Sequence, residues 1–338
     1  MPTAPPPPGH GQHRPESGPS DLDGLLETTA RVVDAVERVV EGKPEVVRLA
    51  LVVLLAEGHL LVEDVPGVGK TVLAKALARA VDCTVRRVQF TPDLLPSDLT
   101  GVSVFDPERR EFEFRPGAVF ANVVLGDEIN RASPKTQSAL LECMEERQVT
   151  VDGVTHPLAS PFMVVATQNP VEMEGTYPLP EAQRDRFTAR VSMGYPSPEA
   201  ELAMLDRHGR SDPLDDLEPV TDAAAVVKLV DVVRGVHVAE AMREYVVALV
   251  GATRASRALR LGASPRATLQ LLRAARASAA LDGRDHVLPH DVQGLAVPVL
   301  AHRLLLSGEA QLGRTDPEDV VADLLERVPV PRPRGGRS

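Results

Sequence analysis

The chain has few of the residues that build disulfide frameworks, aromatic binding surfaces or membrane spans. Its two cysteines, Cys83 and Cys143, fit neither a disulfide framework nor a zinc site, so both are expected to be core thiols in a reducing compartment. Aromatic residues make up 3% of the chain and tryptophan is absent, which leaves little for stacking nucleic-acid bases. No stretch reaches the roughly 18 consecutive apolar residues of a membrane helix, and the proline-rich N-terminus is unlike a signal peptide. We therefore expect a cytoplasmic protein without a membrane span.

The sequence also lacks the positive charge that nucleic-acid-binding proteins carry. Its formal net charge is −11 and its pI is about 5.4, whereas neutralising the phosphates of duplex DNA requires a dense cationic surface. A nucleic-acid partner is therefore not expected, although a pore lined locally with arginine is compatible with this balance. The chain has 338 residues, 43% of them hydrophobic. Because single cores stop growing near about 250 residues, two domains are expected.

What the sequence does contain is a clear order of helical and extended patterns. Residues 1–20 are rich in proline and residues 327–338 are basic, and both are expected to be disordered tails. Residues 21–196 interleave helical patterns with short apolar runs, which predicts an α/β core around a parallel five-stranded sheet. Residues 197–326 are helical in pattern and predict a second, all-α domain. The predicted strands cover residues 59–64, 85–90, 121–128, 162–168 and 189–193.

Two further extended segments interrupt this alternation. Residues 101–120 and 147–162 each contain two β-type runs around a polar or glycine turn, which predicts two β-hairpins that project from the sheet. Before the first strand, a helical pattern from Asp21 onward breaks at residues 42–44. Two helices are therefore expected ahead of the sheet.

The most informative motif is a glycine-rich loop after the first predicted strand. Residues 61–71 read LVEDVPGVGKT, and a helical pattern begins at about Thr71. Gly67 and Gly69 allow the backbone to curl so that successive N–H groups point at phosphate oxygens. Lys70 would then reach the β- and γ-phosphates of a nucleoside triphosphate, and Thr71 would ligate Mg²⁺. The loop therefore predicts a nucleotide-binding protein.

One position departs from the full phosphate-loop pattern. Asp64 stands where that pattern has a further glycine, and the sequence offers no physical reason for it. The predicted nucleotide-binding residues are Asp64, Val65, Pro66, Gly67, Val68, Gly69, Lys70, Thr71 and Val72.

Polar residues follow two of the later predicted strands. VVLGDE ends in Asp127 and Glu128. In a phosphate-loop enzyme Asp127 would hold Mg²⁺ through its water shell, and Glu128 would take a proton from the water that attacks the γ-phosphate. An isolated Asp-Glu pair would also suit a helix cap, but the distance along the chain from Lys70 leaves room for further strands of one sheet, which favours catalysis. Asn169 ends the next strand, where its amide could hold the attacking water.

Three arginines are candidates for contact with a γ-phosphate. Arg184 and Arg186 lie too far along the chain to reach the nucleotide of their own loop, so they would serve a neighbouring subunit or be ordinary solvated charges. Arg266 lies on the first turn of a predicted helix. A cation is unfavourable there, so an anion should face it, either a γ-phosphate or a carboxylate.

A pair of histidines has a spacing that could suit a metal ion. His286 and His290 occur in RDHVLPHDV. We interpret them instead as marking the N-terminus of a helix that has Asp291 in its first turn.

Together these strings resemble the MoxR family of AAA+ ATPases, from about residue 25 to about residue 325. DEINRA, ATQNP, EGTYPLPEAQ and GASPRA are far more specific to that family than the phosphate loop. The resemblance implies that Lys70 and Thr71 form Walker A, and that Asp127 and Glu128 form Walker B. It makes Asn169 sensor 1. The two hairpins match insertions that point into the central pore of related rings.

The resemblance also assigns the arginines and the assembly. It implies that Arg186 is an arginine finger supplied to the next subunit, and that Arg266 is sensor 2 of its own chain's site. Family members commonly have leucine at the position of Arg184. The implied protein is a hexamer that hydrolyses ATP with Mg²⁺ and remodels or activates client protein complexes. Its implied partner carries a von Willebrand factor A domain.

Three other functions remain compatible with the same motifs. A helicase-like DNA motor shares the hairpin insertions, but the acidic balance speaks against it. A nucleotide-gated scaffold would bind ATP without turning it over, and the intact Asp127-Glu128 pair speaks against that. The ATPase subunit of a magnesium-chelatase-like complex would share DEINRASPK, whereas GTYPLPEAQ and GASPRA fit the MoxR family better.

Overall fold

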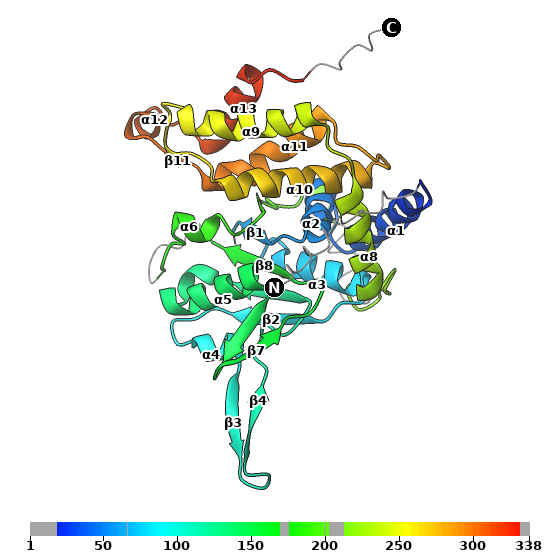
Figure 1. Cartoon of the computed structure of the whole chain (residues 1–338), viewed down its shortest axis with the longest axis vertical. Helices are drawn as coiled ribbons and strands as arrows, with labels where there is room; N and C mark the ends of the chain where they lie inside the picture. The colour runs from blue at the N-terminus through cyan, green and yellow to red at the C-terminus, as the bar shows by residue number, and fades with distance from the viewer. Residues whose placement is uncertain (1–18, 66, 170–175, 200, 203–212, 332–338) are drawn as a thin grey trace, which may run out of the picture.

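The centre of the molecule is a sheet of five parallel strands in the order β2-β5-β8-β1-β9. The predicted α/β class and all five predicted strands are confirmed. The strands are β1 (Leu60–Glu63), β2 (Val85–Gln89), β5 (Val123–Asp127), β8 (Met163–Gln168) and β9 (Ala189–Val191). Figure 1 shows this sheet between the helices at the top of the molecule and a long hairpin below it.

The structure is a computed structural model, and it describes residues 19–65, 67–169, 176–199, 201–202 and 213–331. Most of both predicted tails, residues 1–18 and 332–338, lies outside the described residues. Pro66 of the predicted nucleotide site lies outside them as well.

Helices cover both faces of the sheet. They include α1 (Pro19–Glu37), α2 (Pro44–Leu55), α3 (Lys70–Ala80), α4 (Pro96–Thr100) and α5 (Pro134–Glu146). In β1, Leu60 and Val62 join one buried cluster with α1, α2 and α3, whereas Leu61 joins a second cluster with α4 and α5. Successive strand residues point to opposite faces, so a strand between two helical layers must be apolar on both sides. β5 meets this requirement, since it is buried along its whole length.

Two helices precede β1, as predicted. α2 begins with Pro44, whose missing N–H is not needed at the first position of a helix. α1 begins at Pro19, so the predicted disordered segment 1–20 extends two residues too far. The same rule explains this start, because proline at the first position and Asp21 in the first turn both favour a helix N-terminus.

Both predicted hairpins are present. They are formed by β3 (Val102–Asp106) with β4 (Glu111–Arg115), and by β6 (Gln148–Val151) with β7 (Val154–Pro157). The first extends far beyond the sheet (Figure 1). The rings of Phe114 on β4 and His156 on β7 stack with their centroids 3.8 Å apart, so the two hairpins contact each other.

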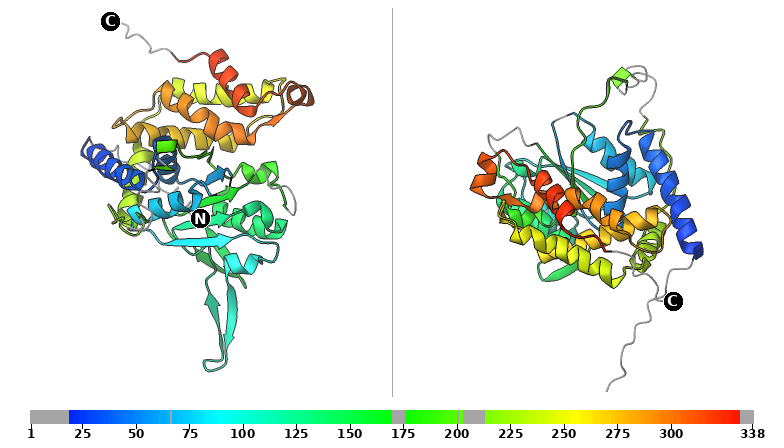
Figure 2. Two further views of the ribbon diagram at one scale, coloured as in Figure 1. Left: turned by 180° about the vertical axis from the view of Figure 1, so that it is seen from behind. Right: turned by 90° about the horizontal axis from the view of Figure 1, so that it is seen from above.

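The chain after β9 builds a helical lid region, as predicted. Its helices include α8 (Ala223–Gly235), α9 (Glu240–Ala255), α10 (Pro265–Leu281), α11 (Pro289–Leu300), η2 (Ala301–Arg303), α12 (Gly308–Leu312) and α13 (Pro317–Arg327). One feature was not predicted, because β10 (Leu259–Leu261) and β11 (Leu305–Leu306) form an antiparallel pair. Strands of three and two residues are too short to show an alternating pattern in a sequence. From above, α9 to α13 lie over the core (Figure 2).

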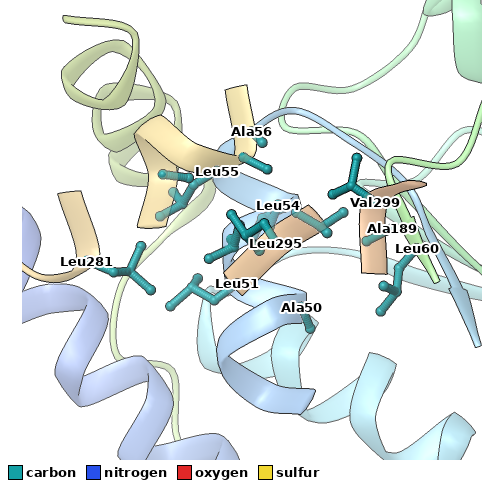
Figure 3. Close-up of a cluster of buried hydrophobic side chains, with 14 of the residues drawn as sticks. Ala50, Leu51, Leu54, Leu55, Ala56, Leu60, Ala189, Leu281, Leu295 and Val299 are labelled. Carbon is teal, nitrogen blue, oxygen red and sulfur yellow. The ribbon is translucent and has the colours of Figure 1, made fainter. Parts of the chain in front are cut away.

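The lid region and the core share one apolar cluster. Figure 3 shows Leu51 and Leu55 of α2 near Leu281 of α10 and Leu295 of α11. All four side chains are buried. Since burying a leucine side chain stabilises a fold by roughly 1.5–3 kcal/mol, this contact holds the lid region against α2.

A buried arginine fastens the lid region at a second point. The side chain of Arg303 in η2 is 2% exposed, and its Nε donates to Asp185 Oδ1 at 2.9 Å. The same guanidinium donates to the carbonyl oxygens of Phe187 and Val299. Removing one partner of a buried, paired charge is costly, because the other charge remains uncompensated. The segment just before β9 is therefore bound firmly to the lid region.

Two buried histidines must stay neutral in the folded protein. His59, just before β1, accepts at Nδ1 a 3.0 Å hydrogen bond from the N–H of Val164, and its Nε2 lies 3.0 Å from the carbonyl oxygen of Met144. Burial lowers the pKa of His59 from 6.5 to about 4, and the charge of Arg147 acts in the same direction. Burial also lowers the pKa of His302, in η2, well below its ordinary value.

The free energy of unfolding should therefore fall as the pH drops from 6.5 towards 4. In that range the unfolded chain binds protons at both histidines and the folded protein does not, so each costs up to roughly 1.4 kcal/mol per pH unit. His59→Asn should make the slope shallower in urea unfolding measured across this range. His286→Asn, at an exposed histidine, is the control and should leave the slope unchanged. An equal slope in His59→Asn and the parent would contradict this account.

Candidate nucleotide-binding site

The glycine-rich loop connects the carboxyl end of β1 to the N-terminus of α3. Gly67 and Gly69 have φ angles of +85° and +92°, in the region that favours glycine. A Cβ at Gly67 would meet no atom within 4 Å, and one at Gly69 would meet only Met193 Cε at 3.6 Å. The backbone conformation, rather than lack of space, therefore requires glycine. Gly69 caps α3, so the N–H groups of its first turn face the loop.

The side chains of Lys70 and Asp64 meet the loop in different ways. Lys70 Nζ donates to the backbone carbonyl oxygen of Asp64 at 2.7 Å. The Asp64 carboxylate accepts from the N–H of Val65 and, on its other oxygen, from Ser192 Oγ and the N–H of Gly194. It is 8% exposed. Asp64 thus lies within the predicted nucleotide site, but its carboxylate is directed at the chain that leaves β9.

Asp127 ends β5 and lies beside the start of α3. Thr71 Oγ1 donates to Asp127 Oδ2 at 3.5 Å, and Thr167 Oγ1 donates to Asp127 Oδ1 at 3.2 Å. Arg87 Nε donates to Oδ2 at 2.6 Å. A threonine hydroxyl and a carboxylate are the hard oxygen ligands that Mg²⁺ prefers. Thr71 and Asp127 therefore fit a magnesium site that the sequence predicted from two distant motifs.

Glu128 is held in an unusual backbone conformation at the tip of β5. Its φ is +56°, and its N–H donates to Thr167 Oγ1 at 3.0 Å. Its carboxylate accepts from Gln89 Nε2 at 2.7 Å and lies 3.2 Å from Arg131 Nε. A left-handed conformation costs a non-glycine residue free energy, and such strained residues occur at turns and also cluster at functional sites. The fold therefore fixes where this carboxylate points, as a catalytic base requires.

Asn169 follows β8, which lies between β5 and β1. It is 5% exposed. In the sheet, Glu63 of β1 is paired with Gln168 of β8, so Asn169 lies at the same edge as the phosphate loop. The structure thus brings together the carboxyl ends of β1, β5 and β8. Ligands of parallel α/β sheets bind at this edge.

Some residues of this edge were not found from the sequence. Gln89 and Arg87 lie on β2, next to β5 in the sheet, and Thr167 lies on β8. Each contacts Asp127 or Glu128. In the sequence, only their position in or near the ends of predicted strands could have indicated them. Which strands are neighbours is decided by the sheet order, and the sequence does not show that order.

Two of the candidate arginines, Arg186 and Arg266, lie at the opposite end of the strands, where β1 and β9 begin. Arg186 Nη2 is 3.1 Å from Glu145 Oε2, and Arg266 is hydrogen-bonded to the other oxygen of Glu145. Glu145 is in the last turn of α5. Both arginines line a pocket of about 240 Å³ that also contains residues 56–59, just before β1, and Thr188, just before β9. None of the lining residues belongs to the phosphate loop.

In this structure Arg266 therefore does not lie beside the nucleotide-binding residues predicted in its own chain. The parallel strands begin near the pocket and end near the phosphate loop. Arg186 and Arg266 therefore lie at the amino ends of the strands, and the predicted nucleotide-binding residues lie at their carboxyl ends. The physical reason is the docking of the lid region: Ser264, which caps α10, donates to Asp185 at 2.8 Å, and Arg303 binds the same carboxylate. The carboxylate that the sequence allowed as the partner of Arg266 is Glu145.

Arg184 lies in the short helix α6 (Glu181–Arg184), close to the other candidate finger. Its Nε is buried and has no hydrogen-bond partner within the part of the chain that the structure describes. Arg186, in contrast, lies on the pocket beside Arg266. This position favours Arg186 over Arg184 as the residue presented to a neighbour.

Among the described residues, His286 and His290 do not belong to one cluster of possible metal ligands. His290, Asp282 and Asp291 do lie close together, but Arg284 donates to both carboxylates and lies 3.1 Å from His290 Nε2. A guanidinium therefore occupies the centre of the cluster. Asp291 lies in the first turn of α11, as predicted, and its carboxylate accepts from the N–H of Leu288, the residue that caps the helix. Among the helices that the structure describes, none combines the length and the apolar character of a membrane span.

Known protein families resemble this chain in both its α/β core and its lid region. A family model described as "ATPase family associated with various cellular activities (AAA)" matches residues 59–189, and one described as "AAA lid domain" matches residues 251–324. Over 329 residues the chain is 43% identical to Chaperone MoxR1 of Mycobacterium tuberculosis, covering 94% of this chain and 87% of that protein. The chain belongs to the MoxR family of AAA+ ATPases.

Two more similarities extend over nearly the whole chain. YeaC of Bacillus subtilis, an uncharacterised protein, is 50% identical over 311 residues, which cover 92% of this chain and 96% of YeaC. The crystal structure of a candidate ATPase from Cytophaga hutchinsonii matches with a TM-score of 0.87 and 38% identity, covering 93% of this chain and 98% of that one. The AAA+ core and its lid region are therefore both shared with a protein of known structure.

Proposed function

We propose that this MoxR-family protein hydrolyses ATP at the interfaces of a homo-oligomeric ring, which we take to be a hexamer. The observation that carries the proposal is the division of the predicted site between two edges of one sheet. The phosphate loop, Asp127 and Glu128 lie at the carboxyl edge, whereas Arg186 and Arg266 lie at the amino edge. A head-to-tail ring brings the second edge of one subunit to the first edge of the next.

In the proposed site each residue has one task. The phosphate-loop N–H groups and Lys70 bind the β- and γ-phosphates. Thr71 and Asp127 would hold Mg²⁺, which supplies charge neutralisation at the phosphate oxygens when bound. Glu128 takes the proton of the attacking water, and Asn169 orients that water. Arg186 and Arg266 of the neighbouring subunit stabilise the negative charge that develops on the transferred phosphoryl group.

The work driven by this cycle is, in our proposal, the remodelling of a client protein. The name of MoxR1 describes that relative as a chaperone, and we propose the same class here, with maturation or activation of a protein complex as the outcome. A partner bearing a von Willebrand factor A domain completes the proposal. The tip of the β3–β4 hairpin carries both Glu108 and Arg109, a mixture that suits a protein client better than a DNA backbone.

The proposed location is the cytoplasm. Cys83 and Cys143 are both buried, unpaired thiols. Burial raises the pKa of Cys83 to about 11 and that of Cys143 to about 12. Thiols are oxidised through their thiolates, so neither residue is prepared for disulfide chemistry. Their state is compatible with a reducing compartment.

Lys70→Ala tests nucleotide binding directly. Removing a hydrogen bond to a charged phosphate should weaken ATP binding by roughly 10- to 100-fold, measured with a fluorescent ATP analogue in the presence of Mg²⁺. Lys75→Ala is the control, because Lys75 lies one turn further along α3. Equal affinity in Lys70→Ala and Lys75→Ala would overturn the assignment of the phosphate loop.

A further inference from the structure

The Asp64 carboxylate is hydrogen-bonded both within its own loop and to a segment far along the chain. One oxygen accepts from the N–H of Val65 at 2.8 Å. The other accepts from Ser192 Oγ at 2.8 Å and from the N–H of Gly194 at 2.6 Å. Burial raises the pKa of Asp64, but these hydrogen bonds and one from the N–H of Met193 outweigh it and lower the pKa overall. The carboxylate therefore stays charged and ties the loop to residues 192–194.

Residues 192–195 lie against the phosphate loop. They form the first stretch of chain after β9, on its way to the lid region. Met193 Cε is 3.6 Å from where a Cβ of Gly69 would be, so its side chain packs on the loop. Lys43, the cap of α2, donates to the carbonyl oxygen of Tyr195 at 2.9 Å. This segment therefore contacts both the loop and α2, the helix on which the lid region packs.

Lys70 adds a direct connection to the nucleotide. Its Nζ donates to the carbonyl oxygen of Asp64, and the N–H of Asp64 donates to the carbonyl oxygen of Gln168 at 3.1 Å. Both backbone groups of Asp64 and both carboxylate oxygens are therefore bonded. A displacement of Lys70 on phosphate binding would act on Asp64, and through its carboxylate on residues 192–194.

We propose that Asp64 is a positioning residue that couples the phosphate loop to residues 192–195, so that nucleotide binding sets the conformation of this segment. The inference rests on the proposed nucleotide site and adds a route from that site towards the lid region. It explains why a carboxylate replaces the glycine of the phosphate-loop pattern. Glycine would satisfy the turn but would leave the N–H of Gly194 and the hydroxyl of Ser192 without their acceptor.

Two variants of Asp64 and one control isolate the effect of the carboxylate. Asp64→Asn keeps the shape but turns one of the two acceptors into a donor, which faces other donors. Asp64→Gly restores the glycine of the usual pattern. Glu63→Gln is the matched control, because Glu63 is an adjacent acid in an ion pair with Arg190, 2.8 Å away, and within the described chain its carboxylate makes no hydrogen bond with residues 192–194.

The first readout separates binding from turnover. Both Asp64 variants lose the charged hydrogen bonds that join the phosphate loop to residues 192–194. We therefore expect both to raise the KM for ATP by about tenfold or more, with a smaller change in kcat. Ser192→Ala should cause part of this change, and adding it to Asp64→Asn should cause no further loss, since both act through one contact. Thermal unfolding establishes that each variant is folded.

The second readout is amide hydrogen exchange of residues 192–195 with and without a slowly hydrolysed ATP analogue and Mg²⁺. In the parent and in Glu63→Gln, the analogue should protect this segment together with residues 67–69. In Asp64→Asn it should protect the loop but not residues 192–195. Parental KM and parental protection in Asp64→Asn or Asp64→Gly would overturn the proposal.

Failure of the proposed function would look different. If the parent bound the analogue without hydrolysing ATP, the proposed ATPase activity would fail, yet the exchange experiment would still decide the role of Asp64. If the analogue protected neither segment in the parent, nucleotide would not set the conformation of residues 192–195, and the inference would fail as well.

Discussion

Arg186→Ala should lower the rate of ATP hydrolysis by about 10³- to 10⁵-fold, the range over which arginine fingers act. ATP affinity should change little, because Arg186 lies at the edge of the sheet away from the phosphate loop of its own chain. The measurements are steady-state phosphate release and equilibrium binding of an ATP analogue. Arg184→Ala is the comparison that decides between the two candidate fingers, and it should retain most of the activity.

Mixing two inactive variants tests whether the arginines act between subunits. In rings assembled from equal amounts of Arg186→Ala and Glu128→Gln, an interface is intact when the first variant supplies Glu128 and the second supplies Arg186. This occurs at about a quarter of randomly formed interfaces, so roughly that fraction of parental activity should return. No recovery in assembled mixed rings would show that Arg186 does not act in trans.

The same mixing experiment applies to Arg266. Because Arg266 shares Glu145 with Arg186, Arg266→Ala mixed with Glu128→Gln should also recover activity. An arginine that served its own chain's nucleotide would give a different result. The Arg266→Ala subunits would then lack the arginine and the others would lack the base, so no interface would be complete.

Glu128→Gln should lower the rate of ATP hydrolysis by about 10²- to 10⁴-fold, the usual contribution of a general base. Glutamine keeps the size of the side chain and its contact with Gln89, so the loss should appear in kcat and ATP binding should persist. Single-turnover phosphate release and analogue binding measure the two effects. Glu142→Gln, on an exposed position of α5, is the control. Parental turnover in Glu128→Gln would remove Glu128 from the role of base.

Much of the fold could be predicted because its signals are local. Apolar strands such as β5 must be buried on both faces, and the patterns around them are helical, so a parallel α/β sheet was the consistent interpretation. Pro44 and Ser264 start helices through preferences that act within one turn. The β10–β11 pair escaped prediction because its strands are too short to carry a pattern.

The candidate site was predicted in part. Lys70, Thr71, Asp127, Glu128 and Asn169 all end or follow parallel strands, and the carboxyl ends of such strands meet at one edge. Gln89 and Thr167 were missed because their contacts depend on which strands are neighbours. The sequence contains the residues of each strand but not the order in which the strands pair.

The sequence by itself determined the chemistry of the phosphate loop, since the backbone of Gly67 and Gly69 and the side chains of Lys70 and Thr71 act within five consecutive residues. Only the tertiary structure decided the places of Arg266 and Asp64. The position of Arg266 depends on the docking of the lid region through Asp185 and Arg303, and it is away from the predicted nucleotide-binding residues of the same chain. Asp64, without explanation in the sequence, is bonded to Ser192 and Gly194. Such contacts join residues between 79 and 130 positions apart, and their partners are set by packing rather than by any local pattern.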